Sequence, residues 1–400
     1  MRKYSLLLLI LLHVASIYGQ EKVTSSQIQS AEKMFALSFS EAKRDSMLSV
    51  LSDKVKTYQY FHSLHIENNV PLPLWFNPVI PEMKIPIKTN ASKFVIPNQI
   101  ELPENINDLA FYSIPQLASL IKNKKISSKK LTEFYISRLK KYGPILHCVI
   151  ELTEQLAMMQ AKKADDEIAK GIYRGMLHGI PYGIKDLFSV KGTHTTWGTP
   201  PYKNQMINET SFVAEKLEQS GAVLIAKLSL GELAMDDVWF GGLTRNPWDT
   251  SKGSGGSSAG SASATAAGLV PFAIGTETYG SIVDPSMRCG VTGLRPTYGS
   301  VAKTGAMNLA WSSDKIGPIC RSAEDAAIVF NYIHGADNKD KSSINFAFNY
   351  ATEIDIHKLK IAYIKNYIDT LPETSSEKQT ITVLKKMGAN IKAINFPDTL

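Results

Sequence analysis

A run of small residues constrains this chain more than any other feature of its sequence. Residues 253–267 read GSGGSSAGSASATAA, and an apolar stretch follows at 269–274. Glycine tolerates backbone dihedral angles that other residues avoid and lets other segments approach closely. A flexible linker, by contrast, is not followed directly by a run of small residues and an apolar stretch. We therefore predict a tightly packed loop at 253–260, a small-residue helix over 261–267 and a strand over 270–274.

Further predicted elements alternate in type along the chain. Apolar runs predict strands at 179–184, 222–226, 360–364 and 391–394, and helical patterns follow Ser127 and occupy 161–169, 211–220 and 377–387. Strands alternating with helices predict an α/β fold, a sandwich with a mixed central sheet surrounded by helices. A content of 44% hydrophobic and 20% charged residues excludes disorder, collagen and coiled coil as the main state.

The formal net charge is +7, from 44 basic and 37 acidic residues spread along the chain. A mild, dispersed excess does not indicate nucleic acid as a partner.

The N-terminus predicts export. Arg2 and Lys3 precede an apolar run at 6–12, and a small residue, Gly19, follows. This pattern is typical of a secretory signal peptide, predicted at 1–19. The run is shorter than the roughly 20 residues that span a bilayer, although an uncleaved anchor remains an alternative. We expect a periplasmic or secreted protein with no stable membrane insertion after signal cleavage.

Residues 20–104 predict an N-terminal helical and proline-rich extension. Met47, Leu51, Val55 and Tyr58 share one helical face. Five prolines between positions 71 and 86 exclude a long helix there.

Cysteine and histidine residues do not indicate a metal site. Three cysteines exclude a disulfide scaffold and a four-cysteine metal site. Two of them could pair in an oxidising compartment, but we expect Cys148, Cys289 and Cys320 to be small buried hydrophobic residues. His62 and His65 are the nearest approach to a metal pair, and they lack a third ligand.

Several ordered motifs then point to one family. They read GIPYGIKD at 179–186, NPWD at 246–249, GGSS at 255–258, GTETYGSI at 275–282 and CGVTGLRPT at 289–297. Together they resemble the amidase signature family over residues 110–400. The resemblance implies a single α/β/α domain over 105–400 without a metal or organic cofactor. Members continue well past the position of Leu400, so we expect this sequence to be truncated at its C-terminus.

The resemblance implies a catalytic triad. Ser281 falls at the nucleophile, Ser257 at a proton-relaying serine after a cis Gly256–Ser257 peptide bond, and Lys185 at the base. The residue types suit amide hydrolysis, because a serine hydroxyl needs a base to remove its proton. A lysine can serve only when neutral, although its usual pKa is about 10.4. Burial lowers that pKa, and apolar residues at 184 and 187–188 flank Lys185.

The same resemblance implies an oxyanion hole made by the backbone of Thr278, Tyr279, Gly280 and Ser281. Tyr279 replaces the first of two glycines that usually precede the nucleophile, and it is strained if that position needs a positive φ. We expect Tyr279 and Ser258 to contact the substrate. A second departure is at 283–284, where Val-Asp stands in place of an arginine and an apolar residue.

Three alternatives stay open. Residues 256–260 fit G-x-S-x-G, with Ser258 as an α/β-hydrolase nucleophile and Asp337 and His357 as its partners. However, residues 249–253 look like a loop, whereas such an elbow follows a strand. The motifs S-x-x-K at 127–130, Y-x-N at 202–204 and K-T-G at 303–305 imitate a penicillin-binding enzyme. Tyr279 also allows a catalytically weak or inactive binding protein on the amidase fold.

The sequence therefore predicts an exported amidase acting on a small-molecule or peptide amide. Family members that amidate misacylated tRNA work in the cytoplasm with partner subunits, and the export signal argues against that role. The oligomeric state is not predicted.

Overall fold

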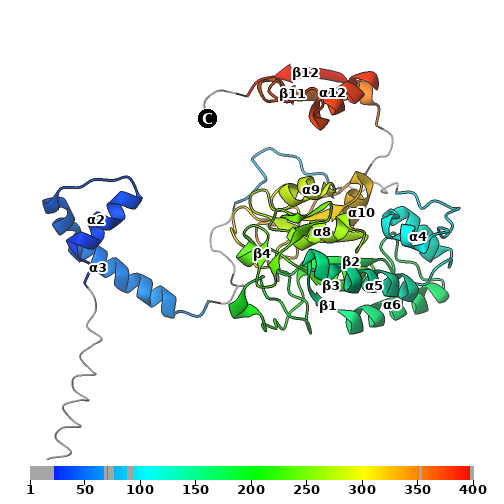
Figure 1. Cartoon of the computed structure of the whole chain (residues 1–400), viewed down its shortest axis with the longest axis horizontal. Coiled ribbons are helices and arrows are strands. Elements are labelled where there is room, and N and C mark those ends of the chain that lie inside the picture. Colours follow the sequence, from blue (N-terminus) through cyan, green and yellow to red (C-terminus); the bar gives the residue numbers. More distant parts are fainter. Residues whose placement is uncertain (1–21, 67–69, 71–75, 88–93, 351–353, 397–400) are drawn as a thin grey trace, which may run out of the picture. The chain divides into compact units, whose positions relative to one another are not determined.

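The computed structural model describes residues 22–66, 70, 76–87, 94–350 and 354–396. The chain forms two compact units, Met1–Val70 and Pro71–Leu400 (Figure 1). The division falls within the extension expected over 20–104. The signal peptide expected at 1–19 lies outside the described residues. Each unit is described by itself below.

The first unit contains helices α2 (Ser25–Met34) and α3 (Glu41–Ser63). The hydroxyl of Ser40 caps α3 by accepting a hydrogen bond from the backbone of its first turn. The buried Glu32 carboxylate joins the helices by accepting hydrogen bonds from Arg44 at 2.8 and 3.0 Å. The helical pattern expected from Ser25 to about Leu64 is divided between these two helices, and no residue of α3 is buried.

The second unit is built on a six-stranded mixed sheet, as the sequence predicted. The strands, in spatial order, are β1 (Val149–Leu152), β3 (Val223–Leu228), β2 (Pro181–Lys185), β8 (Phe272–Glu277), β10 (Lys315–Cys320) and β9 (Thr292–Gly293). The central strands β3, β2 and β8 are parallel, and the outer pairings are antiparallel. Every residue of the three parallel strands is buried, which explains why they read as nearly continuous apolar runs.

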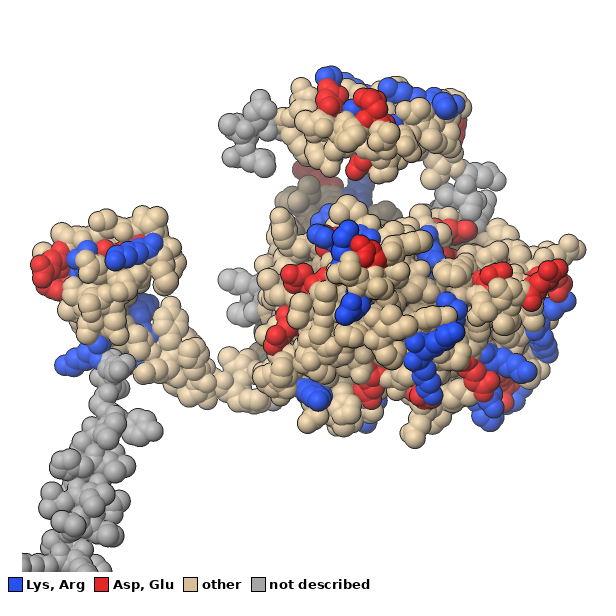
Figure 2. Space-filling model, in the orientation of Figure 1, with Lys and Arg blue, Asp and Glu red and all other residues tan. Residues whose placement is uncertain are grey.

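Helices surround this sheet (Figure 1). They are α4 (Ile114–Lys122), α5 (Ser128–Leu146), α6 (Glu154–Ala169), α7 (Phe212–Gln219), α8 (Ala259–Ala266), α9 (Val283–Cys289) and α10 (Ala323–Ile333). Helices α5 and α8 contact each other and both contact β2 and β3, while α10 contacts β10 and α7. Figure 2 shows basic and acidic side chains interspersed on the visible face of this unit.

Helix α8 explains the run of small residues. Seven of its eight residues are buried. A Cβ atom added at Gly260 would lie 2.5 Å from the carbonyl oxygen of Cys148, closer than real contacts allow. Only a residue without a side chain fits where α8 approaches the sheet.

The second unit also contains further helices and strands. They are η1 (Ile106–Phe111), η2 (Pro200–Tyr202), η3 (Glu232–Ala234), β4 (Val238–Trp239), β5 (Gly242–Leu243), β6 (Arg245–Asn246), β7 (Asp249–Gly253), η4 (Ile356–Lys358), β11 (Lys360–Ile364), α11 (Lys365–Ile368), α12 (Ser376–Lys386) and β12 (Asn390–Ile394). Strands β11 and β12 pair in parallel, and α12 lies between them in the chain. Among the described residues, no helix has the length and apolarity needed to cross a membrane.

One expectation about the residues that precede Ser258 was wrong. Residues 249–253 form strand β7, which pairs with β6, rather than a loop. The centre of β7 is exposed, so its polar sequence carries no apolar alternation that would reveal a strand. The expectation for the cysteines is confirmed, since Cys148, Cys289 and Cys320 are all free and buried.

Candidate active site

Three segments meet around the amine of Lys185. Lys185 ends β2, Thr276 lies near the end of the neighbouring strand β8, and Ser257 and Ser258 immediately precede α8. The Lys185 Nζ atom lies 2.8 Å from Ser257 Oγ, 3.0 Å from Thr276 Oγ1 and 3.1 Å from Ser258 Oγ. Three hydroxyl groups therefore surround the amine. They belong to residues 257–258 and 276, which are far from Lys185 in the sequence.

The surroundings of Lys185 favour a neutral amine. Its side chain is completely buried, and no carboxylate within the described ranges forms an ion pair with it. Desolvation lowers the pKa of Lys185 to about 7, although the charges of Asp314 and Glu277 act in the opposite direction. A substantial fraction of Lys185 is thus neutral near pH 7, as a general base must be.

The hydrogen bonds around the Lys185 amine favour an orientation in which its lone pair points toward Ser257. Ser258 Oγ donates to the Thr276 carbonyl at 3.0 Å and accepts from the Thr276 N–H at 3.2 Å. With its proton used in this way, Ser258 can only accept a hydrogen bond from Lys185. A neutral amine has two donors and one lone pair. If Thr276 Oγ1 accepts the other donor, the lone pair of Lys185 faces Ser257.

Ser258, which we expected to contact the substrate, lies in the interior of the structure. Its side chain has no exposed surface and lies between Lys185 and β8. A contact between Ser258 and the substrate stays a prediction.

The loop before Ser257 is held by two carboxylates. The Gly256–Ser257 peptide bond is cis, as the resemblance implied. Asp237 accepts a hydrogen bond from the Gly255 N–H at 2.9 Å, and Asp284 accepts one from the Gly256 N–H at 3.3 Å. A Cβ atom at Gly256 would lie 1.8 Å from a backbone oxygen, so this position requires glycine.

Glu277 shapes the turn that carries Ser281. Its buried carboxylate accepts hydrogen bonds from the N–H groups of Ile282 and Val283 at 2.9 and 3.0 Å. The Ser281 carbonyl accepts a further hydrogen bond from the Ser258 N–H at 3.0 Å. The turn is therefore attached both to β8 and to the loop of Ser257. No hydrogen bond links the hydroxyls of Ser281 and Ser257 in the described part of the chain.

The tyrosine in this turn is not strained. Positive φ occurs at Gly280, at +83°, and not at Tyr279. The Tyr279 side chain is 95% exposed, so it points away from the interior. The backbone N–H groups of Tyr279, Gly280 and Ser281 donate to no acceptor among the described residues. They are available to a substrate oxygen, as an oxyanion hole requires.

The alternative motifs do not assemble into sites. Ser127 caps α5, Lys303 forms an ion pair with Asp340 at 3.0 Å, and His357 pairs with Asp355 at 3.0 Å. Ser258 does not follow a strand directly, because residues 254–257 separate it from β7. Within the described ranges, no group of three or more His, Cys, Asp and Glu side chains could hold a metal ion.

Sequence reasoning missed several residues of this region. Thr276 and Glu277 lie inside the motif at 275–282, but only their contacts show what they do. Two further residues, Asp186 and Lys227, form a buried ion pair behind the site at 2.6 Å. The sequence contains one signal that could have revealed this pair, which is a lysine within the apolar run of β3.

The fold and this arrangement define an α/β protein with a buried lysine–serine centre at one end of a mixed sheet. The Amidase family profile matches residues 130–400, and the chain belongs to the amidase family. A curated relative, a glutamyl-tRNA(Gln) amidotransferase subunit from Coxiella burnetii, is 39% identical over 297 residues, 72% of this chain and 61% of the relative.

Solved structures agree with this assignment. The peptide amidase from Stenotrophomonas maltophilia is 31% identical with a TM-score of 0.65, covering 72% of this chain and 62% of that one. The corresponding glutamyl-tRNA(Gln) amidotransferase subunit from Thermotoga maritima is 28% identical with a TM-score of 0.62, covering 74% and 63%. The chain thus spans about six tenths of the length of the relatives it matches.

Proposed function

We propose that this protein hydrolyses a carbon–nitrogen amide bond by acyl transfer through Ser281, with Ser257 as proton relay and Lys185 as base. The observation that carries the proposal is the 2.8 Å contact between Ser257 and a buried lysine that forms no ion pair with a carboxylate among the described residues. Membership of the amidase family supports the same reaction class.

In the first half of the reaction, Ser281 Oγ attacks the carbonyl carbon of the amide. Its proton passes to Ser257, whose own proton passes to neutral Lys185. This transfer needs the Ser257 hydroxyl to turn toward Ser281. Negative charge develops on the substrate oxygen, where the free backbone N–H groups of residues 279–281 can stabilise it.

Collapse of the tetrahedral intermediate breaks the carbon–nitrogen bond. The departing nitrogen takes a proton back from Lys185 through Ser257, and an acyl ester remains on Ser281. A water molecule then attacks the ester along the same proton path. The carboxylic acid leaves, and all three side chains return to their starting protonation states.

We propose that the substrate is a small-molecule or peptide amide. The exposed Tyr279 ring beside Ser281 offers an apolar surface to a group next to the scissile bond. We further propose export to the periplasm or the exterior, supported by the pattern of residues 1–19. N-terminal sequencing of the protein recovered outside the cytoplasm tests export, and a chain retained inside the cell with Met1 intact contradicts it.

The test of the enzymatic proposal is labelling with a serine-reactive fluorophosphonate, mapped by peptide mass spectrometry. We expect an adduct on Ser281 that is absent from Ser281→Ala and strongly reduced in Lys185→Ala. An adduct on Ser258 or Ser127 would instead support one of the alternative motifs. A folded chain without any adduct would favour a binding protein on the amidase fold.

A further inference from the structure

Two completely buried lysines lie on adjacent parallel strands. Lys185 ends β2, and Lys227 lies in β3 opposite Ile184. Hydroxyl groups surround the amine of Lys185, whereas Lys227 Nζ lies 2.6 Å from a carboxylate oxygen of Asp186. Because burying an unpaired charge is very unfavourable, only Lys227 has the surroundings that a buried ammonium requires.

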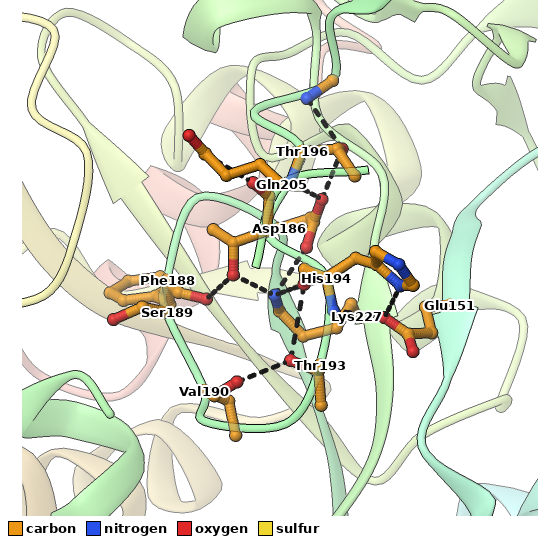
Figure 3. Close-up of polar contacts among 12 residues, drawn as sticks. Glu151, Asp186, Phe188, Ser189, Val190, Thr193, His194, Thr196, Gln205 and Lys227 are labelled. Atoms are coloured by element: carbon orange, nitrogen blue, oxygen red, sulfur yellow. Dashed lines mark hydrogen bonds and ion pairs between the residues drawn. The ribbon is translucent and has the colours of Figure 1, made fainter. Parts of the chain in front are cut away.

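The carboxylate of Asp186 is held from two sides (Figure 3). Its Oδ2 accepts hydrogen bonds from the backbone N–H and the hydroxyl of Thr196, at 2.8 and 2.5 Å. Its Oδ1 makes an ion pair with Lys227 rather than a well-aligned hydrogen bond. The ammonium also donates to the His194 carbonyl at 2.6 Å and the Thr195 hydroxyl at 3.1 Å. These contacts close the loop of residues 187–197 onto both strands.

The backbone of Asp186 is fixed as well. Its N–H donates to the Leu228 carbonyl at 2.9 Å, and its carbonyl accepts from the Trp197 N–H at 3.2 Å. Lys185 is the last residue of β2, and Asp186 follows it directly. The Asp186 side chain contacts Lys227, whereas the Lys185 side chain contacts Ser257.

We propose that Asp186 and Lys227 form a positioning pair for Lys185: they hold the end of β2 so that the amine faces Ser257, and each cancels the charge of the other beside the base. This inference rests on the proposed function, in which Lys185 reacts as a neutral amine. An unpaired carboxylate next to Lys185 favours the charged amine, and an unpaired ammonium disfavours it.

Other charged groups face this region and bear on the test. Glu277 and Asp314 both favour the charged form of Lys185. On the opposite side, Glu151 accepts a hydrogen bond from the His194 N–H at 2.8 Å and lies 3.3 Å from the His194 ring. His194 is partly exposed and lies against Glu151, so it needs its own control.

The experiment measures the rate of fluorophosphonate labelling of Ser281 against pH in the full chain. The midpoint is the pH at which the labelling rate is half of its maximum. We expect this midpoint to lie about one pH unit higher in Lys227→Met, which lowers the rate about tenfold at pH values below it. Asp186→Asn should move the midpoint down, and the double variant should return it close to the wild-type value. Lys227→Arg, which keeps the charge, and His194→Gln should leave it in place.

Opposite shifts separate a charge effect from general loosening. If a substitution only loosens the packing around Lys185, water reaches the amine and the midpoint moves upward in both single variants. That result would overturn the proposal. Unshifted midpoints in both single variants would overturn it as well. Near-ultraviolet circular dichroism identifies variants that fold. If Lys227→Met does not fold, the direction of the shift in Asp186→Asn decides. A wild-type chain that is not labelled at Ser281 contradicts the proposed function itself, whereas a labelled wild type with unshifted variants contradicts only the role of the pair.

Discussion

Lys185 Nζ and Ser257 Oγ lie 2.8 Å apart, and both side chains are removed from solvent. No carboxylate pairs with this lysine among the described residues, although Glu277 and Asp314 are near enough to influence its charge. The polar partners of this titratable amine are three hydroxyl groups and the Thr276 carbonyl, all of them uncharged. The protonation of Lys185 should therefore control both catalysis and stability, with different pH dependences.

The activity should rise with pH through the titration of Lys185. Desolvation lowers its pKa to about 7, and only the neutral amine accepts a proton. We expect kcat/KM for an amide substrate to increase about tenfold per pH unit below that value and to level off above it. Steady-state rates between pH 5 and 9 measure this. A rate that falls as the pH rises through 7 would contradict a lysine base.

Replacing Lys185 by methionine should abolish the activity and change how stability depends on pH. The pKa of Lys185 is about 7 in the folded chain and about 10.4 in an unfolded one. Between these values the unfolded chain binds more protons, so wild-type stability rises with pH. Below pH 7 both states carry the proton, and the cost of a charged lysine in the interior is fully present.

The advantage of Lys185→Met should therefore be greatest below pH 7. We expect its unfolding free energy, relative to wild type, to fall by about 3 kcal/mol between pH 6 and pH 9. Urea unfolding at both pH values measures the difference. Because the lost hydroxyl contacts affect both pH values equally, the change with pH isolates the charge. An equal difference at pH 6 and pH 9 would show that the pKa of Lys185 is not lowered.

Sequence patterns predicted the buried parallel strands well and the polar or interrupted ones poorly. Strands β2 and β3 are apolar because both faces are covered. In β10, Gly317 and Pro318 resemble a turn. Gly317 is nevertheless needed within the strand, because a Cβ atom there would lie 1.9 Å from the carbonyl oxygen of Leu294. Such a contact joins distant residues and leaves no local pattern.

The candidate site shows the same division. Lys185, Ser257 and Ser281 could be named because ordered motifs carry them. The contacts that fix them could not, because the contacts of Thr276, Asp284 and Lys227 join residues that are far apart in the sequence. Whether Tyr279 is strained also depended on one backbone angle, which the sequence does not state.

The two neighbouring serines provide a matched comparison. Ser257→Ala removes the proposed relay, and we expect kcat/KM to fall by roughly 10²–10⁴-fold. Ser258→Ala leaves the Thr276 N–H without its acceptor, so the unfolding free energy should fall by about 1–3 kcal/mol. Rates and urea unfolding of both variants separate these effects. Equal rate losses in the two variants would contradict a specific relay by Ser257.

The turn before Ser281, the proposed nucleophile, should tolerate a change at Tyr279 better than one at Gly280. Gly280 has a φ of +83°, and a Cβ atom there would meet open space. Gly280→Ala therefore strains only the backbone, by about 1–2 kcal/mol. If the chain relieves this strain by rotating the turn, its N–H groups move away from the substrate oxygen. We expect kcat to fall about tenfold for each 1.4 kcal/mol of lost transition-state stabilisation.

Tyr279→Gly is the matched control. The φ of Tyr279 is not positive, so this variant relieves no strain and should keep the turn in place. Its exposed ring contributes to substrate binding in our proposal, so KM for bulky amides should rise while kcat changes by less than about threefold. Kinetics with a small and a bulky amide distinguish the two variants. A large gain of kcat in Tyr279→Gly would show that the tyrosine, and not Gly280, limits the oxyanion hole.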